Sequence, residues 1–232
     1  MTSIVEVRHV SKSYGNKQAL KDVSLSIPAG RIVGLIGKNG MGKTTLIKLI
    51  NDLLTIDEGE IRIDGQTPGT ATKQIVSYLP ERTYLDRGMK VKDVVRYFAD
   101  FYSDFDTEKA NRLIKELGLD DKMKIGTMSK GMQEKLQLIL VMARKAKLYI
   151  LDEPLGGVDP ATRDYILDTI LSNFAQGATV VLSTHLIADI ERILDEVIII
   201  EDGEIKQHVD ADTLRGEQNC SIDEYFRRTY KW

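Results

Sequence analysis

Cysteine is nearly absent from this chain of 232 residues, since Cys220 is the only one. A single thiol excludes an internal disulfide and a cysteine-held metal cluster, and it fits a reducing compartment. Long apolar stretches are also absent: those at residues 138–143 and 197–200 fall far short of the roughly 18 residues that a membrane span requires. Residues 1–10 lack the basic and then apolar order of a signal peptide. We therefore expect a cytoplasmic protein that does not cross a bilayer by itself.

An excess of charge of either sign is missing too. The 32 basic residues are balanced by 35 acidic ones, and the net charge of −3 offers no general attraction for nucleic acid or anionic lipid. A content of 42% hydrophobic and 29% charged residues is typical of a soluble globular protein. Repeats, linkers and low-complexity tracts are not found. We expect a single domain over residues 1–232 and no nucleic-acid partner.

The first third of the chain has the pattern of short strands around one helix. Residues 4–7, 25–27 and 61–63 predict strands of an N-terminal antiparallel β lobe, with a turn at Asp64-Gly65. Residues 31–36 form a nearly continuous apolar run that ends in glycines, and a helical pattern follows over 44–53. The order there is strand, glycine loop, helix.

Later segments predict an α/β core interrupted by helices. Helical periodicity dominates residues 82–145, whereas the strand-like runs at 148–151, 179–183 and 197–200 alternate with helical segments, as expected of a parallel sheet. Asp202-Gly203 predicts a hairpin, and the polar tail includes a helix at 222–228. The single domain is thus divided into a core with its β lobe (1–81 and 146–203), an inserted helical lobe (82–145) and a C-terminal hairpin and tail (204–232).

The glycine loop fits the phosphate-loop pattern. It consists of Gly37, Lys38, Asn39, Gly40, Met41, Gly42, Lys43 and Thr44. Its glycines let successive backbone N–H groups surround a β-phosphate at a helix N-terminus, and Lys43 would neutralise the β- and γ-phosphate oxygens. Thr44 is placed to bind Mg²⁺, and Thr45 to support the α-phosphate region. The alternative is a glycine-rich turn with a solvated lysine.

Two acidic residues follow a second apolar strand. Asp152 and Glu153 end the run that begins at Lys147, at the edge where ligands of open α/β sheets bind. Asp152 would hold the Mg²⁺ shell, and Glu153 would polarise the water that attacks a γ-phosphate. The alternative is an ordinary acidic turn that caps a helix.

Further motifs make the chain similar to the nucleotide-binding subunit of an ABC transporter, from about residue 5 to 203. Tyr14 matches the aromatic that stacks on adenine, and residues 128–132, with Ser129 and Gly131, match the signature sequence. The signature precedes an apolar helix predicted at 136–146. Asp159 matches the loop at the dimer interface, and His185 matches the switch histidine, which together with Glu153 and Lys43 would make up the catalytic set. On residues alone, the favoured alternatives are a half-buried strand residue for Tyr14 and a structural role for His185.

The resemblance implies a fold, cofactors and partners. The fold would be a P-loop NTPase cassette with a RecA-like parallel-sheet core. ATP and Mg²⁺ would be bound between two cassettes, each giving its phosphate loop to one nucleotide and its signature to the other. A homodimer is expected, with a heterodimer as the alternative. Separate transmembrane permease subunits would hold the chain at the cytoplasmic face of the membrane.

The chain departs from the family pattern at two places. Glu81 stands where glutamine is common; a carboxylate can bind Mg²⁺ or water, but it adds negative charge beside a triphosphate. In the signature, Lys130 and Met132 replace glycine and glutamine. Both departures are more similar to exporters than to importers. Residues 82–105 are also rich in aromatics, which would serve either as a groove for the membrane partner or as the core of the helical lobe.

Two other functions compete with transport. A soluble mechanical ATPase of the same superfamily would act on ribosomes, DNA or a metal-cluster scaffold, but such relatives carry two cassettes or a long coiled coil, and neither is present. A phosphate-loop kinase would give no role to the signature or to His185. His9 and His208 are expected to be surface residues, and Cys220 an inert one.

Overall fold

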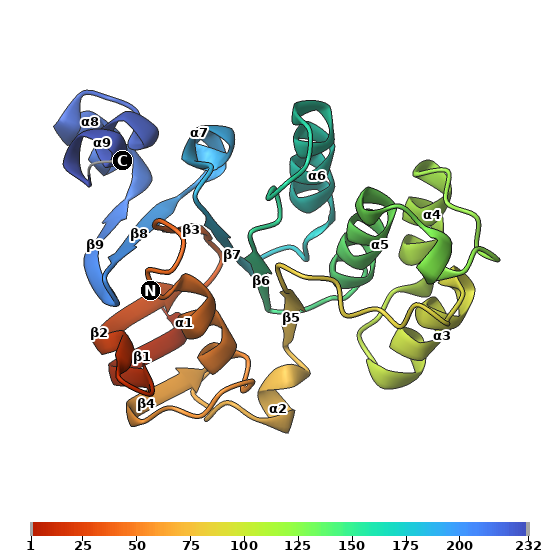
Figure 1. The fold of residues 1–232 in the computed structure, drawn as a ribbon, viewed down its shortest axis with the longest axis horizontal. Coiled ribbons are helices and arrows are strands. Elements are labelled where there is room, and N and C mark those ends of the chain that lie inside the picture. The colour runs from red at the N-terminus through yellow and green to blue at the C-terminus, as the bar shows by residue number, and fades with distance from the viewer. Residues whose placement is uncertain (1, 231–232) are drawn as a thin grey trace.

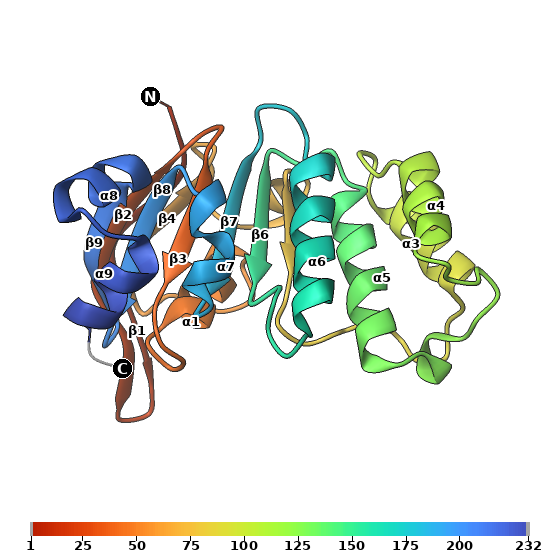
Figure 2. The same cartoon turned by 90° about the horizontal axis from the view of Figure 1, so that it is seen from above.

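Two sheets organise the computed structural model, which describes residues 2–230 (Figure 1). The three-stranded antiparallel sheet has the order β2–β1–β4, and the second sheet has the order β5–β6–β7–β3–β8–β9. Helices pack around the second sheet, and a group of helices extends from one of its sides (Figure 2). The predicted α/β class, with a parallel core and an antiparallel β lobe, is confirmed.

The antiparallel sheet contains all three of the strands predicted near the N-terminus. Its strands are β1 (Ser3–Tyr14), β2 (Lys17–Pro28) and β4 (Glu58–Ile63), so β1 and β2 extend well beyond the predicted segments. The turn between β1 and β2 includes Gly15, whose φ of +57° is a left-handed conformation that glycine adopts without strain.

The second sheet is parallel except at one edge. Its strands are β3 (Ile32–Ile36), β5 (Val76–Leu79), β6 (Leu148–Asp152), β7 (Thr179–Thr184), β8 (Glu196–Glu201) and β9 (Glu204–Asp210). Only β9 is antiparallel, through the predicted hairpin at Asp202-Gly203. Because parallel strands end at the same edge, the residues that follow β3, β6 and β7 are brought together.

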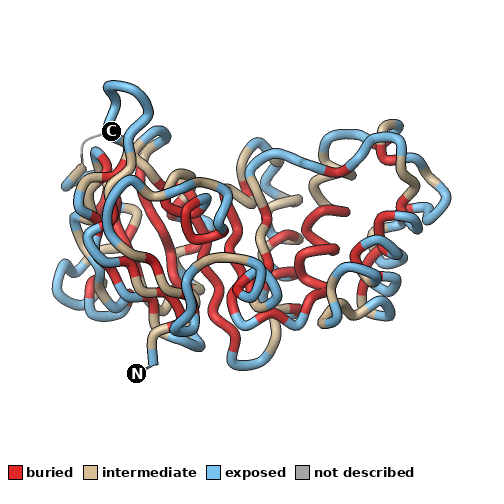
Figure 3. Tube along the Cα trace, turned by 90° about the horizontal axis from the view of Figure 1, so that it is seen from below, coloured by how far each residue is buried: buried red, intermediate tan, exposed pale blue. Residues whose placement is uncertain are grey.

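Helix α1 (Lys43–Ile50) joins the two sheets in one core. Its Leu46, Ile47 and Leu49 are buried against apolar residues of both sheets. Figure 3 shows the buried residues concentrated in the strands and in the helices beside them. The helix is shorter than the predicted 44–53, because Asp52 has a left-handed φ of 54° that ends the helical path.

The predicted helical lobe contains α3 (Val91–Phe101), α4 (Thr107–Glu116), the 3₁₀ turn η1 (Ile125–Thr127) and α5 (Lys130–Met142). A short helix, α2 (Thr70–Lys73), precedes β5. In α3, Val91, Val94, Val95 and Phe98 form the buried face. The predicted apolar helix at 136–146 in fact begins at Lys130, because the Ser129 side chain accepts a hydrogen bond from Met132 N and caps it there.

The C-terminal half adds helices on the sheet and beyond it. Helix α6 (Pro160–Asn173) lies beside α5, and α7 (Ile187–Ile190) with η2 (Glu191–Ile193) follows β7. The predicted tail helix is confirmed as α9 (Ile222–Thr229), but α8 (Ala211–Gln218) was not predicted. Within residues 2–230, no helix is both long and apolar enough to span a bilayer.

Arg144 ties the end of α5 to the sheet. Its side chain is only 3% exposed and donates to the carbonyl oxygens of Lys73, Gln74 and Val76 and to the carboxylate of Asp104. The guanidinium also lies 3.8 Å from the ring centroid of Tyr102. A buried charge with this many partners fixes the helical segment against β5.

We predict that Arg144→Ala lowers the free energy of unfolding by about 3–5 kcal/mol, because it leaves a carboxylate and several carbonyls unpaired in the interior. The control is Arg96→Ala, which removes an exposed pair with Asp100 and should change stability by less than about 1 kcal/mol. Urea denaturation followed by circular dichroism measures both. Equal midpoints for the two variants would show that Arg144 does not tie the segments together.

Candidate functional site

The glycine loop after β3 is built by close backbone packing. A Cβ on Gly37 would lie 2.4 Å from the carbonyl oxygen of Ile200, and one on Gly42 would lie 2.8 Å from that of Ala19. Gly42 also has a φ of +111°. Any larger residue at either position would push the loop off β8 or β2. The loop, residues 37–42, therefore leads into α1 with its backbone fixed on both sides.

Lys43 lies under this loop and is only 4% exposed. Its Nζ donates to Gly37 O at 2.5 Å and to Lys38 O at 3.2 Å, and it lies 3.2 Å from Glu153 Oε1. The contact with Glu153 is an ion pair without hydrogen-bond geometry. The ammonium is thus held where the loop, α1 and the end of β6 meet.

Asp152, the last residue of β6, is a buried carboxylate with one oxygen bonded and one not. Its Oδ1 accepts hydrogen bonds from Ser183 Oγ at 2.5 Å and from Thr44 Oγ1 at 3.4 Å. Among the described residues, Oδ2 is buried with no hydrogen-bond partner. Burial raises the pKa of Asp152, and Glu153 and Glu81 raise it further, against the two hydrogen bonds.

Glu153 is the centre of the charged contacts. Its Oε2 lies 2.9 Å from His185 Nδ1, while its backbone N–H donates to Ser183 O and Ser183 Oγ. Glu153 has a φ of +50°, a conformation that costs a non-glycine residue roughly 1–3 kcal/mol and often marks a functional position. The sheet thus holds the carboxylate between an ammonium and an imidazole.

Ser183 is a site residue to which we assigned no role from the sequence. It pairs directly with Asp152 in the register of β6 and β7 and bonds to both acidic residues. The signal was available, because Ser183 ends an apolar strand just as Asp152 does, and parallel strands end at a common edge.

Glu81 is exposed after β5 and is brought near the two acidic residues. Together with Asp152 and Glu153 it lines a cleft of about 30 Å³. That volume is enough for one water molecule, and carboxylate oxygens supply the polar partners that such a water needs.

Other predicted site residues lie away from this cluster. Ser129 and Asp159 are the N-caps of α5 and α6. Each side chain accepts a hydrogen bond from a backbone N–H in the first turn of its helix. A Cβ on Gly131 would have no neighbour within 4 Å, so the start of α5 is open. Figures 1 and 2 show α1 and α5 on either side of β6, so helix α5 lies apart from the helix that follows the glycine loop of its own chain. Tyr14 is 48% exposed at the tip of the β1–β2 hairpin.

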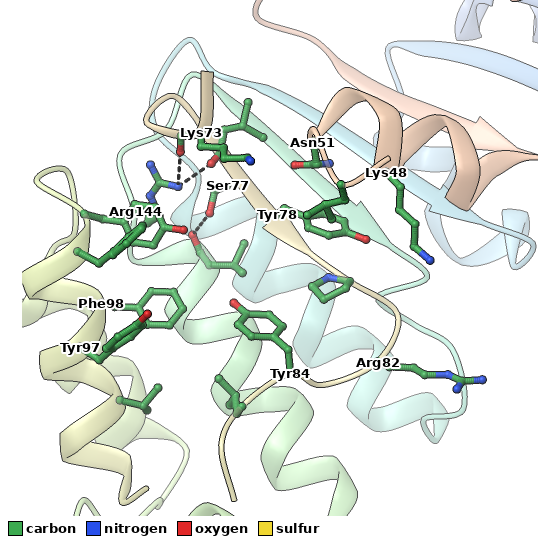
Figure 4. Close-up of a pocket in the computed structure, with 18 of the residues that line it drawn as sticks. Lys48, Asn51, Lys73, Ser77, Tyr78, Arg82, Tyr84, Tyr97, Phe98 and Arg144 are labelled. Carbon is green, nitrogen blue, oxygen red and sulfur yellow. Dashed lines mark hydrogen bonds between the residues drawn. The ribbon is translucent and has the colours of Figure 1, made fainter. Parts of the chain in front are cut away.

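A groove of about 800 Å³ lies between the sheet and the helical segment (Figure 4). Tyr84, Tyr97 and Phe101 line it and are 53%, 56% and 57% exposed, and the rings of Tyr97 and Phe101 stack at 6.1 Å. Phe98 also lines the groove, but it is buried in the core of the helical segment. The aromatic residues are therefore divided between the surface of this groove and the core of the helical segment.

Comparison with known proteins places these features in a family. Residues 20–156 match the family described as ABC transporter. The chain is 34% identical over 217 residues to the ABC transporter ATP-binding protein YtrB of Bacillus subtilis, covering 92% of this chain and 74% of that protein. It is 31% identical to the SkfA peptide export ATP-binding protein SkfE of the same organism, covering 88% of each chain. It is also 30% identical to the Nod factor export ATP-binding protein I of Burkholderia lata, covering 96% of this chain and 76% of that protein.

Solved structures agree with the sequence comparison. A structure described as an ATP-binding subunit of an ABC transporter matches with a TM-score of 0.87 and 30% identity, covering 99% of this chain and 100% of that one. A nucleotide-free ATP-binding cassette matches with a TM-score of 0.76 at 21% identity, covering 94% and 96%, which shows the fold alone.

We predict that Asp152→Asn raises the melting temperature of the protein without ligands at neutral pH. A carboxyl whose pKa is raised by folding destabilises the fold once it ionises, above its ordinary value of 3.8, and the amide removes that charge while keeping the shape. Below that pH the carboxyl is protonated in both states, so the gain should vanish. Differential scanning calorimetry at several pH values measures this, and a lower melting temperature at neutral pH would contradict it.

Proposed function

Because this chain belongs to the ABC transporter family, as an ATP-binding and ATP-hydrolysing subunit, we propose that it powers export through separate membrane-spanning chains. Export is supported by the names of the relatives SkfE and Nod factor export protein I. None of the relatives named above is a soluble mechanical ATPase, so that alternative has no support from them.

One arrangement supports this function above the others: Lys43, Asp152, Glu153 and His185 converge beneath the glycine loop. Residues 37–42 and Lys43 would bind the β- and γ-phosphates of ATP, and Thr45 would support the α-phosphate region. Tyr14, exposed at its hairpin tip, would stack on the adenine.

Mg²⁺ fits the donors that are present. Within the described residues, no group of three or more acidic, histidine or cysteine side chains could hold a metal by itself. Mg²⁺ is usually bound through one or two carboxylates together with substrate phosphates, and the unpartnered Asp152 Oδ2 and the Thr44 hydroxyl provide that pattern. We assign these two residues to the metal, with Glu81 near enough to share a water. Bound Mg²⁺ would supply charge neutralisation of the phosphates.

Glu153 would activate the attacking water. Its carboxylate accepts a proton from the water as the oxygen attacks the γ-phosphorus in line and the bond to the ADP oxygen breaks. His185 holds Glu153 Oε2 at 2.9 Å and so orients the base. When ATP binds, Lys43 must exchange Glu153 for the γ-phosphate, since the carboxylate and the phosphate compete for the same ammonium.

A second cassette would complete each site. Ser129 and Gly131 stand at the open N-terminus of α5, where backbone N–H groups and the helix dipole favour an anion, yet α5 lies apart from the helix that follows the glycine loop of its own chain. In a head-to-tail dimer each chain would present them to the γ-phosphate held by the other, with Asp159 at the interface. One chain carries every motif, which favours a homodimer.

The groove of Figure 4 would receive a helix of the membrane-spanning chain. Exposed Tyr97 and Phe101 offer an apolar surface on α3. Strand β5 connects the groove to the nucleotide site, because Tyr78 of this strand lines the groove and Glu81, just after it, lines the cleft beside Asp152. This would hold the chain at the cytoplasmic face of the membrane.

We predict that Glu153→Gln lowers the rate of ATP hydrolysis by about 10²–10⁴-fold, since the general base is lost, while ATP binding is kept. The matched control is Glu196→Gln, because Glu196 is also paired with a histidine, His208, away from the site. Steady-state phosphate release and nucleotide titration measure the two effects. Hydrolysis near the wild-type rate would remove Glu153 from this role.

A second prediction concerns the groove. Tyr97→Ser with Phe101→Ser should release the chain from the membrane fraction of its host, because both side chains are exposed and contribute contact area rather than core packing. ATP binding should not change. Leu171→Ser, at another exposed apolar residue, is the control. Cross-linking from Tyr97→Cys, followed by mass spectrometry, identifies what occupies the groove, and an unchanged membrane fraction would contradict this assignment.

A further inference from the structure

The helices that begin at Ser129 and Asp159 form a parallel pair. Helices α5 and α6 lie side by side in both views (Figures 1 and 2). They contain 13 and 14 residues, so each is about 20 Å long at 1.5 Å per residue. The segments at their N-termini contain Ser129 and Asp159. Under the function proposed above, a partner cassette contacts both segments at the same time.

A single ammonium joins their C-termini. Lys109 of α4 donates from Nζ to the carbonyl oxygen of Met142, the last residue of α5, at 2.6 Å, and to that of Asn173, the last residue of α6. The last carbonyls of a helix have no partner within the helix and carry the negative end of its dipole, so they suit a cation. Lys109 is half-buried, and burial lowers its pKa, so these carbonyls hold an ammonium that has given up much of its water.

The contact with α6 is the distinctive part of this arrangement. Helix α4 is already fixed to the end of α5 by the backbone, because Asp106 N donates to Ala143 O at 2.8 Å. Asp106 Oδ1 in turn caps α4 by accepting from Lys109 N. The Lys109 side chain then connects the joined ends of α4 and α5 to the end of α6. Tyr149 makes a second connection nearby, donating to Arg144 O and accepting from Ala175 N.

The two helices are also in contact along their length and at their N-terminal ends. Lys135 Nζ of α5 lies 5.4 Å from the ring centroid of Tyr165 of α6. A Cβ on Gly157, just before α6, would lie 3.5 Å from Lys130 Nζ at the start of α5. The pair is therefore packed as one body, and an axial slip at its C-terminal end would appear at its N-terminal end.

We propose that Lys109 is a positioning residue for ATP hydrolysis: it fixes the axial register of α5 against α6 and thereby the spacing between Ser129 and Asp159. This inference rests on the proposed dimeric site. In this role Lys109 contacts neither the nucleotide nor the attacking water, and it acts only through the positions of the two helices. A displacement of about 1 Å in a reacting constellation lowers rates by as much as about 10²-fold, so loss of the register would be measurable.

Lys109→Met tests the proposal, because it keeps the apolar stem and removes the ammonium. ATP affinity of the single chain, which depends on its own glycine loop, should stay within about twofold, while ATP-dependent dimerisation in a Glu153→Gln background weakens and kcat falls by about 10–100-fold. Lys109→Arg should restore most of both. Lys115→Met, at an exposed lysine of the same helix, is the control.

Distances report the register without activity. Spin labels on Thr127→Cys and Asp164→Cys, in a Cys220→Ser background, should show a shifted or broader separation in Lys109→Met. If that variant does not fold, Lys109→Gln, which keeps a donor for one carbonyl only, should show the same pattern at smaller size. Unchanged distances, dimerisation and kcat would overturn the proposal, as would an equal loss of ATP affinity and kcat. A wild-type chain that neither dimerises nor hydrolyses ATP would instead overturn the proposed function.

Discussion

Buried charge at the carboxyl edge of the sheet is the constraint on which the rest of the structure depends. Lys43, Asp152 and Glu153 are nearly excluded from water, and they bring one basic and two acidic side chains together. Burying such a group costs free energy that ion pairs and hydrogen bonds must offset. The glycine loop supplies carbonyls to Lys43, and Ser183 Oγ donates to the Asp152 carboxylate while accepting from the backbone N–H of Glu153. The excess of acidic over basic side chains fits a site that takes up its triphosphate together with a divalent cation.

The short strand β5 lies between this charged site and the groove. Tyr78 and Pro80 line the groove, and Leu79, Pro80 and Glu81 line the water-sized cleft. Gln137 of α5 holds the segment that follows β5, because it donates to Pro80 O and accepts from Tyr84 N. Burial raises the pKa of Tyr78, and the nearby carboxylates Asp152 and Glu81 raise it further. A helix seated in the groove would therefore contact the same strand that borders the water-sized cleft.

The sequence was most informative where chemistry demands a fixed pattern, and least where tertiary contacts decide. Residues 37–45, Asp152 and His185 could be named because strands of clear periodicity lead into them. The start of α5 was missed because Gly131 lies in its first turn, and only the Ser129 cap makes helix favourable there. Helix α8 is polar and contains Gly216, so its sequence shows no clear helical pattern of apolar residues. Burial of Ala211 and Leu214 against the core stabilises this helix. Arg144 and Lys109 join segments far apart in the chain, and no local pattern reveals such contacts.

The position of β3 has a consequence for synthesis of the chain. This strand, residues 32–36, is made early, but its neighbours in the sheet are β7 and β8, which end at residues 184 and 201. The loop that follows it rests on Ile200, and Met41 O accepts from Gly203 N. Pairing across such long separations is slow, and it cannot start before the later strands exist. A nascent chain on the ribosome is therefore expected to leave residues 37–42 without their native supports until residues up to 203 have emerged.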